Sequence, residues 1–458
     1  MKPIFKAVPV LTFRLILLIL FICVALVVIA FARGYRWDFK EHNLTSTGII
    51  YVNSFPTAAK VYLNGDLKGV TDSNLTLPYG TYTVEVQKEG YSSWKKTVSL
   101  QGEIVLSLNA RLFSKNPSLS PLTNLGVSKI VPIGNSDRYV LVTNIDNEEK
   151  NGLYLFESGK KPLGFFSPLK LLLVSDTLPN SLDPSSVELH YSPNYRQAVV
   201  TFSPKIDENQ ILADIIKRTD LKTTSYLISL EDENTQLFDV TTSIDNILQA
   251  WDEELNNATL KLIEALPQKI RTAAKESMLI VSVSPDEKKI MYVAKHDTTL
   301  PFVINPPLIG SNQTKEVRLI EVGDVYIYDT KEDKNYKVNI NTETIKELVG
   351  QRDFIIAQDS QEVATTEPTV EQYIVWDDEI ARLVHDQAQW YPTSDYIGIK
   401  RSKQIDLVSY DGTNNVTVYA GPFDKSFFGF DANWNLIILT NLNPDNNEFG
   451  DLYSVGII

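Results

Sequence analysis

The sequence predicts a mostly β protein with an N-terminal transmembrane helix, a small β-sandwich and a β-propeller of about six blades that carries a helical insertion. Three observations predict it: a long apolar run near the N-terminus, a stretch of short alternating strands between tight turns, and an irregular repeat of strands over the remaining chain. The predicted segments are a cytoplasmic tail at 1–14, the apolar span 15–32, a juxtamembrane linker at 33–47, the sandwich at 48–112, a second linker at 113–127 and the propeller at 128–458, with the helical insertion at 244–276 and an apolar loop at 299–310.

The composition is that of a globular protein that buries a core. The 458 residues are 43% hydrophobic and 22% charged, and their number allows about two to four domains. The 57 acidic and 43 basic residues give a net charge of −14, which repels a phosphate backbone and argues against nucleic-acid binding. The single cysteine, Cys23, excludes an intramolecular disulfide and a cysteine-based zinc site.

The N-terminal apolar run is long enough to cross a bilayer. Leu15 to Phe31 is an uninterrupted run of 17 apolar residues, and Ala32 extends it to 18. A bilayer core needs about 17–25 residues in a helix, whereas a cleaved signal peptide has an apolar region of about 7–15. The length favours an uncleaved anchor. Two alternatives stay open, namely cleavage after the small-x-small pattern Ala30-Phe31-Ala32 and a buried helix of a soluble protein.

The orientation of this span is not decided by its flanking charges, which are nearly balanced. Its place at the N-terminus, with no further span in the sequence, predicts a signal anchor that sends the C-terminal bulk across the membrane. We therefore expect a single-pass cell-membrane protein with its large part extracytoplasmic, and Tyr35 and Trp37 at the headgroup level. The flanking charges are Lys2, Lys6 and Arg14 before the run and Arg33, Arg36 and Lys40 after it.

A small β-domain is predicted next to the membrane, from about Gly48 to Leu112. Lys60 to Leu63 alternates polar and apolar side chains and is followed at once by Asn64-Gly65, which is a strong hairpin signal. Six or seven short strands in about 65 residues indicate a β-sandwich. The expected strands are Ile49–Val52, Lys60–Leu63, Leu67–Val70, Leu75–Leu77, Thr81–Gln87, Trp94–Leu100 and Ile104–Leu108.

Five motifs punctuate this β-domain: Ser54-Phe55-Pro56, Val61-Tyr62-Leu63-Asn64-Gly65, Pro78-Tyr79-Gly80-Thr81-Tyr82, Lys88-Glu89-Gly90-Tyr91 and Trp94. In kind and spacing they resemble the PEGA domain, a small sandwich of prokaryotic surface proteins, although the namesake tetrapeptide is degraded to Pro56-Thr57-Ala58-Ala59. The resemblance implies a surface location, with adhesion or spacing as the role, and no catalytic residues. We expect the aromatic residues to pack in the core, with a sugar-stacking platform as the alternative; they are Tyr62, Tyr82, Tyr91 and Trp94.

The rest of the chain carries an irregular repeat of a turn followed by β-strands. Its clearest copy has the turn Ser284-Pro285-Asp286, a strand at 290–293 and a second strand at 324–329 that ends in an acidic residue. Units of three or four strands that cannot bury their faces alone indicate a β-propeller, in which proline and aspartate shape the turns. Further copies begin at Asn135-Ser136-Asp137, Tyr191-Ser192-Pro193-Asn194, Trp390-Tyr391-Pro392-Thr393 and Asp431-Ala432-Asn433-Trp434, with a faint one at Asp359-Ser360-Gln361.

This set of turns and strands resembles the TolB-type and WD-repeat-like propellers, whose blades carry the same Ser-Pro-Asp turn and a Tyr-x-Tyr-Asp type of strand. The shortest spacing between copies runs from Pro392 to Ala432. It is close to the length of about 40–45 residues that one blade of such a propeller needs. The clear and faint copies together predict about six blades, with five to seven allowed.

Two insertions interrupt the repeat. Apolar residues recur at helical spacing from Ile244, and Pro267 separates them from a second short helix, so the segment 244–276 is predicted to be a helical pair. This pair either packs on the propeller or protrudes as an arm that binds a partner. The apolar loop 299–310 is interrupted by prolines and is a poor strand. It either tucks against a neighbour or marks a contact site.

No motif predicts a catalytic, cofactor-binding or metal residue, so we expect none of these and no cofactor. Asp445–Gly450 resembles a calcium loop faintly, but Phe449 stands at its fifth position, and Asp146–Gly152 lacks the spacing as well. His190 and His385 are expected at strand ends rather than as ligands. Three acidic pairs could serve a glycosidase, although such pairs arise by chance among 57 acidic residues: Glu148-Glu149, Asp207-Glu208 and Asp377-Asp378.

The function that the sequence favours is a non-enzymatic scaffold of a prokaryotic cell envelope. The membrane would hold residues 15–32, and the propeller would bind an envelope protein or a cell-wall glycan. A different class, an exported propeller hydrolase or lyase that acts on cell-wall polymer, is the alternative, and carboxylates with raised pKa values in the channel would support it. A third possibility is an assembly factor, on analogy to TolB propellers alone.

Overall fold

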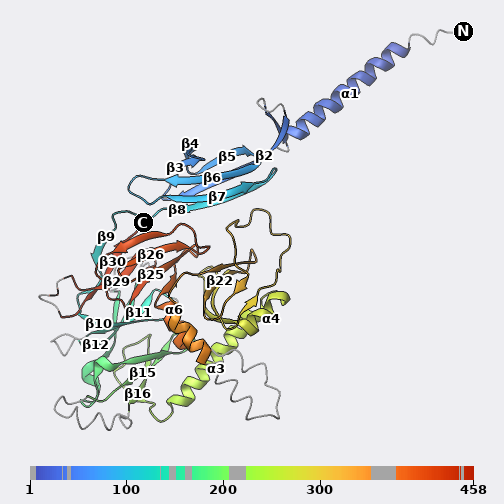
Figure 1. Cartoon of the computed structure of the whole chain (residues 1–458). Coiled ribbons are helices and arrows are strands. Elements are labelled where there is room, and N and C mark those ends of the chain that lie inside the picture. The colour runs from blue at the N-terminus through green and yellow to red at the C-terminus, as the bar shows by residue number, and fades with distance from the viewer. Residues whose placement is uncertain are drawn as a thin grey trace, which may run out of the picture. The chain divides into compact units, whose positions relative to one another are not determined.

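The computed structural model of the chain divides into two compact units (Figure 1). The first comprises Met1–Leu112 and Leu308–Gln313, and the second comprises Phe113–Pro307 and Thr314–Ile458. The structure is mostly β, with one apolar N-terminal helix and several sheets. The described residues are 7–32, 35–38, 43–134, 136–143, 151–159, 168–205, 223–351, 378–442, 444 and 448–458.

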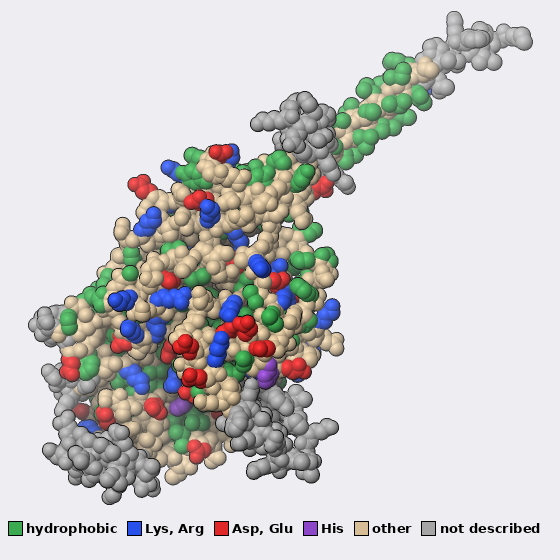
Figure 2. Space-filling view, in the orientation of Figure 1, with side chains coloured by type: hydrophobic (Ala, Val, Ile, Leu, Met, Phe, Trp, Pro, Cys, Tyr) green, Lys and Arg blue, Asp and Glu red, His purple; other side chains and the backbone are tan. Residues whose placement is uncertain are grey.

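The N-terminal apolar run forms helix α1, Ala7–Ala32, whose 26 residues span about 39 Å at 1.5 Å per residue. The stretch Thr12–Ala30 has a mean hydropathy of 3.2, and none of it is buried. Figure 2 shows hydrophobic side chains along this helix. A helix that is apolar on every side has no polar face to turn to water. Its length and composition suit a membrane span, and a signal sequence has the same properties.

The segment expected as a linker at 33–47 contains strands, so that expectation was wrong. Strand β1, Tyr35–Asp38, pairs antiparallel with the start of β2, Asn43–Phe55. Because β2 runs over 13 residues, its first part needs backbone hydrogen-bond partners, and β1 supplies them. Aromatic residues are good strand formers. The prediction overlooked this because it considered only the affinity of Tyr35 and Trp37 for the membrane–water interface.

The first unit contains two four-stranded sheets within its described residues. The other strands are β3 Lys60–Leu63, β4 Asp66–Val70, β5 Ser73–Pro78, β6 Gly80–Gln87, β7 Trp94–Leu100 and β8 Val105–Arg111. One sheet has the order β1-β2-β5, with β8 paired in parallel to β2, and the other has the antiparallel order β4-β3-β6-β7. Each strand of the predicted sandwich is therefore present.

Alternation along these strands places one shared core between the sheets. Val84 and Val86 of β6 are fully buried, and Trp94 is 5% exposed. Tyr82 and Tyr91 pack against the same cluster, so the expectation of core packing is confirmed for these two and Trp94. It was wrong for Tyr62, which is half-buried between Val61 and Leu63 and is not part of the cluster, because alternation along β3 turns its side chain to the other face. The predicted Asn64-Gly65 hairpin joins β3 to β4, with φ values of 52° and 92° that match a type I′ turn.

The second unit contains five four-stranded antiparallel sheets within its described residues. In chain order they are the first sheet (β10 Val127–Pro132, β11 Arg138–Thr143, β12 Gly152–Glu157, β13 Leu169–Val174), the second (β14 Glu188–Tyr191, β15 Gln197–Phe202, β16 Thr224–Ser229, β17 Phe238–Asp239), the third (β18 Met278–Val283, β19 Lys289–Ala294, β22 Val325–Asp329, β23 Lys334–Lys337), the fourth (β24 Ala388–Trp390, β25 Tyr396–Lys400, β26 Gln404–Ser409, β27 Val416–Ala420) and the fifth (β28 Phe428–Phe430, β29 Leu436–Thr440, β30 Asp451–Gly456, β9 Ser118–Pro121).

Each of the five clear repeat turns lies between the first and the second strand of one sheet. The turn Ser284-Pro285-Asp286, for example, joins β18 to β19. The faint copy at Asp359-Ser360-Gln361 lies outside the described residues. Each clear copy of the sequence repeat therefore corresponds to one four-stranded sheet.

The linker expected at 113–127 supplies a strand to the last sheet, which corrects the prediction. Strand β9 pairs with β30, and Ser120 lies opposite Ser454. Phe113, just before it, is fully buried among side chains of the fourth and fifth sheets. Pro121 misled the prediction because proline cannot donate to a ladder, but β9 is an edge strand, where proline is tolerated.

Apolar clusters join the five sheets in series. One cluster contains residues of the second and first sheets, another of the first and fifth, a third of the fifth and fourth, and a fourth of the fourth and third. The central strands of these sheets are apolar on both faces, as in β19, which is buried throughout. Both faces of most sheets are thus covered by a neighbour.

Three labelled helices accompany the third and fourth sheets (Figure 1), and a further helical segment is described over 343–351, with Ile345 and Val349 buried in the cluster that joins these sheets. α3, Ile244–Glu264, and α4, Gln268–Ser277, occupy the segment predicted as a helical pair, with Pro267 between them. α4 is anchored on the third sheet by Ile270 and Ala274, both fully buried. α6, Asp378–His385, packs against β18 and β24. The short elements are η3 Ser175–Thr177, η4 Pro184–Ser186, β20 Thr298–Thr299 and β21 Leu319–Ile320.

Candidate binding cavity

A cavity of about 280 Å³ lies among the repeat turns of the second unit. Residues of four of the five sheets and of α6 line it, so segments that are far apart in the chain, such as those of Tyr139 and Phe430, meet there. Its volume is just below the range of about 300–1,000 Å³ that ligand pockets occupy. The lining residues are Pro132, Ser136, Asp137, Tyr139, Pro285, His385, Gln389, Trp390, Pro392, Phe430, Asp431 and Ala432.

Side-chain hydrogen bonds shape the turns that form the wall. The Ser284 hydroxyl donates to Asp286 Oδ1 at 2.7 Å and accepts from the backbone N–H of Lys289 at 2.9 Å, which holds Pro285 at the turn. The turns have the structural role that the sequence predicted. They also face a common cavity, which the sequence analysis missed, although turns that recur at one position of each sheet are a signal for it.

Three side-chain hydrogen-bond donors of the cavity wall are engaged by the protein. The Tyr139 hydroxyl donates to the Phe430 carbonyl at 3.0 Å, and the Trp390 indole N–H donates to Ser282 Oγ at 3.1 Å. The Ser136 hydroxyl donates to the Ile133 carbonyl at 2.6 Å. Burial, followed by the nearby Asp137 carboxylate, raises the pKa of Tyr139, so this phenol keeps its proton at neutral pH.

His385 lies in the cavity wall at the end of α6, not at the end of a strand, so that expectation was wrong. Gln389 Nε2 donates to the Phe428 carbonyl at 2.9 Å and lies 3.4 Å from His385 Nδ1. Burial, with a further contribution from Lys400, lowers the pKa of His385 to about 4. The imidazole is therefore neutral at pH 7. His190 lies within β14, opposite Val199 of β15.

Two carboxylates give the cavity a negative charge. The carboxylate of Asp431 serves its own turn, since Oδ1 accepts from the backbone N–H of Asn433 and of Asn435, each at 2.8 Å, and Oδ2 accepts from the Asn435 side chain at 3.1 Å. Asp137 is half-buried, and within the described part of the chain no donor bonds its carboxylate. No lysine or arginine is among the described residues that line the cavity.

The other sequence features that could have served chemistry do not build a site. The pairs Glu148-Glu149 and Asp207-Glu208 lie outside the described residues, as do Asp377 and the side chain of Asp378. The calcium-like segments 146–152 and 445–450 lie largely outside them as well. Among residues that the structure describes, no group of three His, Cys, Asp or Glu side chains could hold a metal ion.

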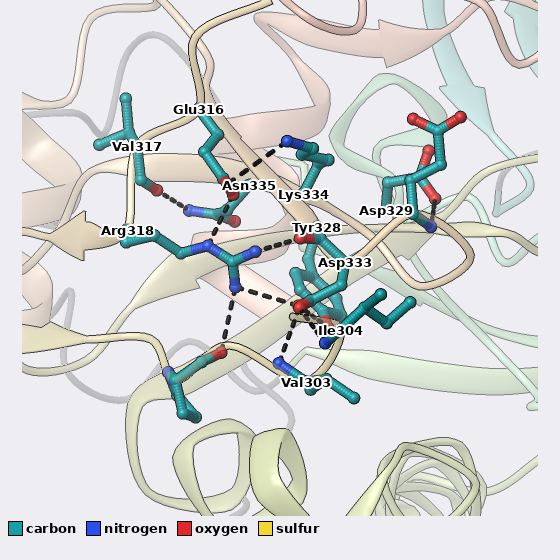
Figure 3. A network of polar contacts seen from close by, with 12 residues as sticks. Val303, Ile304, Glu316, Val317, Arg318, Tyr328, Asp329, Asp333, Lys334 and Asn335 are labelled. Atoms are coloured by element: carbon teal, nitrogen blue, oxygen red, sulfur yellow. Dashed lines mark hydrogen bonds and ion pairs between the residues drawn. The ribbon is translucent and has the colours of Figure 1, made fainter. Parts of the chain in front are cut away.

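A buried polar network holds the first half of the apolar loop 299–310 on the third sheet (Figure 3). Arg318 donates through Nη1 to Asp333 Oδ1 at 3.0 Å, and its Nε lies 2.6 Å from Glu316 Oε2. Asp333 Oδ2 in turn accepts the backbone N–H of Val303 at 2.7 Å and of Ile304 at 2.8 Å. Burial alone would raise the pKa of Asp333, but these hydrogen bonds and Arg318 lower it, so the carboxylate stays charged.

The two halves of the apolar loop have different surroundings. Phe302 is 50% exposed, and the Arg318 guanidinium lies 4.5 Å from its ring centre. Leu308–Gln313 groups with the first unit, where the Gln313 side-chain amide bonds both the N–H and the carbonyl of Ser99 on the edge strand β7. The first half is thus fixed on the third sheet, which agrees with a tucked loop rather than a free one.

Comparison with solved structures finds distant likenesses. TolB from Acinetobacter baumannii is 8% identical with a TM-score of 0.19, over 82% of this chain and 59% of that one. A prolyl endopeptidase is 8% identical with a TM-score of 0.17, over 84% and 40%. A Trichoderma reesei carbohydrate-active enzyme of family AA12 is 11% identical with a TM-score of 0.19, over 92% and 97%. The chain thus spans less than two thirds of the length of the first two proteins, and TM-scores this low carry no argument.

The comparison of sequences is informative for the first unit. No curated protein matches the chain. The PEGA domain family model matches residues 47–116, which include the two-sheet sandwich from Gly48 onward. This match and the candidate membrane helix α1 fit a surface-anchored protein. The PEGA resemblance carried by Asn64-Gly65, Pro78-Tyr79-Gly80 and Lys88-Glu89-Gly90-Tyr91 is therefore confirmed by the match of the family model to residues 47–116.

Proposed function

We propose that this protein is a membrane-anchored, extracytoplasmic and non-enzymatic binding protein of a prokaryotic cell envelope. In this proposal α1 is an uncleaved anchor, the PEGA domain is a spacer or wall-contacting module, and the second unit is a β-propeller. The cavity among the repeat turns presents a binding site to an envelope protein or a cell-wall glycan. Nucleic acid is not a partner, because the chain carries a net charge of −14.

The propeller is supported by the topology of the second unit. A propeller arranges four-stranded antiparallel sheets radially, with the first strand of each sheet innermost. Here five such sheets pack in series from the second, through the first, fifth and fourth, to the third. The fifth sheet combines β9, near the start of this unit's chain, with β30 at its end. The ring would be complete if the second and third sheets also met.

The cavity is the observation that carries the binding function. It combines aromatic and proline surfaces with a few polar groups, as ligand sites do. It lies beside the turns between first and second strands, so four repeats contribute to a single site. A hydrolase would need a free pair of carboxylates, one of them with a raised pKa. Asp431 is engaged by Asn433 and Asn435, which favours binding over hydrolysis.

The experiment is co-sedimentation of the full chain, solubilised in detergent, with isolated cell-wall polymer. We expect saturable binding and no release of soluble wall fragments. Ala432→Trp would fill the cavity from a half-buried position, and we expect it to weaken binding at least tenfold. Asn433→Trp, on the exposed side of the same turn, is the matched control and should bind normally.

Each other outcome has a definite meaning. Released fragments would contradict a non-enzymatic role and would make Asp137 the next residue to test. If no polymer binds, cross-linking of the anchored protein in its own membrane should yield a protein adduct that Ala432→Trp loses. Absence of both wall binding and such an adduct would overturn the proposal.

A further inference from the structure

We infer that the cavity binds an organic cation, through the primary ammonium or guanidinium head of its ligand. This inference rests on the proposed binding function and names the ligand chemistry. Three observations on the cavity wall carry it: its hydroxyl and indole donors are already engaged, two of its acceptors have no donor among the described residues, and the charged side chains that line it are both acidic.

Among the described residues, the hydroxyl and indole donors of the wall are not available to a ligand anion. The Tyr139 hydroxyl, the Trp390 indole and the Ser136 hydroxyl each donate to a protein oxygen, at 3.0, 3.1 and 2.6 Å. An anion or a carbonyl ligand would find these donors engaged, and breaking such bonds leaves buried oxygens unsatisfied. A ligand that would accept hydrogen bonds from these three groups is therefore disfavoured.

The wall does offer acceptors. Gln389 Nε2 faces the Phe428 carbonyl at 2.9 Å, and this partner fixes the amide so that Nε2, not Oε1, points there. No donor among the described residues bonds Gln389 Oε1 or the Asp137 carboxylate. A ligand that enters must donate to these oxygens, and ammonium and guanidinium groups have donors only.

The electrostatic and aromatic surroundings favour a positive charge as well. Asp137 and Asp431 are both near enough to Tyr139 to raise its pKa, and the only other ionisable group of the described wall apart from that phenol, His385, is neutral at pH 7. A desolvated cation is attracted electrostatically to the face of an aromatic ring. Asp431 is engaged by its own turn, so Asp137 is the residue that would pair with the ligand.

The test is isothermal titration of the full chain in detergent with cadaverine, with lysine blocked at both ends, and with the same blocked lysine acetylated at Nε. We expect saturable binding of a charged probe and at least tenfold weaker binding of the acetylated one. Tighter binding of cadaverine would indicate a small amine as the natural ligand, and tighter binding of blocked lysine would indicate a side chain of a peptide.

Three variants assign the effect to the cavity. Asp137→Asn should weaken cation binding at least tenfold, and Asp137→Glu, which keeps the charge, should retain most of it. Asp232→Asn removes an exposed carboxylate elsewhere in the second unit and should change nothing. Equal binding of the charged and acetylated probes, unchanged binding by Asp137→Asn with a normal unfolding temperature, or no binding of any cation would overturn the inference. If cell-wall polymer still binds in that case, the proposed function stands.

Discussion

At the scale of single residues, the buried ion pair of Arg318 and Asp333 stabilises the third sheet and its loop. Their side chains are 9% and 2% exposed. We expect Arg318→Met to lower the free energy of unfolding by about 3–5 kcal/mol, because it leaves the Asp333 carboxylate buried without its partner. Denaturant titration followed by circular dichroism measures this change in the free energy of unfolding. Arg196→Met breaks a pair with Glu231 on the surface and serves as the control, with little expected change.

Asp324, which immediately precedes β22 in the same sheet, makes a pH-dependent contribution to stability. Burial would raise its pKa, but Lys337 and Lys346, at 2.5 and 2.8 Å, lower it to about 2. The unfolded pKa is about 3.9, so the folded state prefers the charged form. The stabilisation is complete above about pH 4 and is lost as the pH falls through about 2. We therefore expect the unfolding temperature of Asp324→Asn to be lower than that of the wild type at pH 6, and the two temperatures to converge near pH 2.

At the scale of elements, the β3–β4 hairpin depends on one glycine. Gly65 has φ of 92° and open space around its Cβ position, so a side chain there meets backbone strain but no clash. We expect Gly65→Ala to destabilise the PEGA domain by about 1–2 kcal/mol. Gly69→Ala, in β4 of the same hairpin, has open space without a positive φ and should be nearly neutral. Thermal unfolding of both variants measures the stability that each one loses. Equal losses of stability would refute the assignment of backbone strain to Gly65.

The elements whose conformation depends on residues nearby in the sequence could be predicted. The elements that form only by pairing with a distant segment could not. The hairpin at Asn64-Gly65 and the helices around Pro267 follow from local turn chemistry and periodicity. Strand β9 has four exposed residues and two prolines nearby, and only its pairing with β30 makes it a strand. The cavity was missed for the same reason, since its wall gathers turns from four sheets.

At the scale of the whole molecule, the pairing of β9 with β30 joins the two ends of the second unit's chain. In a Cys23→Ser background, Ser120→Cys with Ser454→Cys places two thiols on directly opposed residues of adjacent strands, close enough for a disulfide. We expect it to form on mild oxidation and to raise the unfolding temperature, because it closes a loop that contains almost the whole second unit.

The matched control moves one thiol along the strand. Ser118 lies opposite Gly456, so Ser118→Cys with Ser454→Cys is out of register by two residues and should cross-link poorly. Faster migration on a non-reducing gel, reversed by reductant, reports the bond. Equal cross-linking of both pairs would show that β9 has no fixed register on β30. A propeller closed by these strands requires the first pair to form and the second to fail, since a closed ring fixes the register of its last sheet.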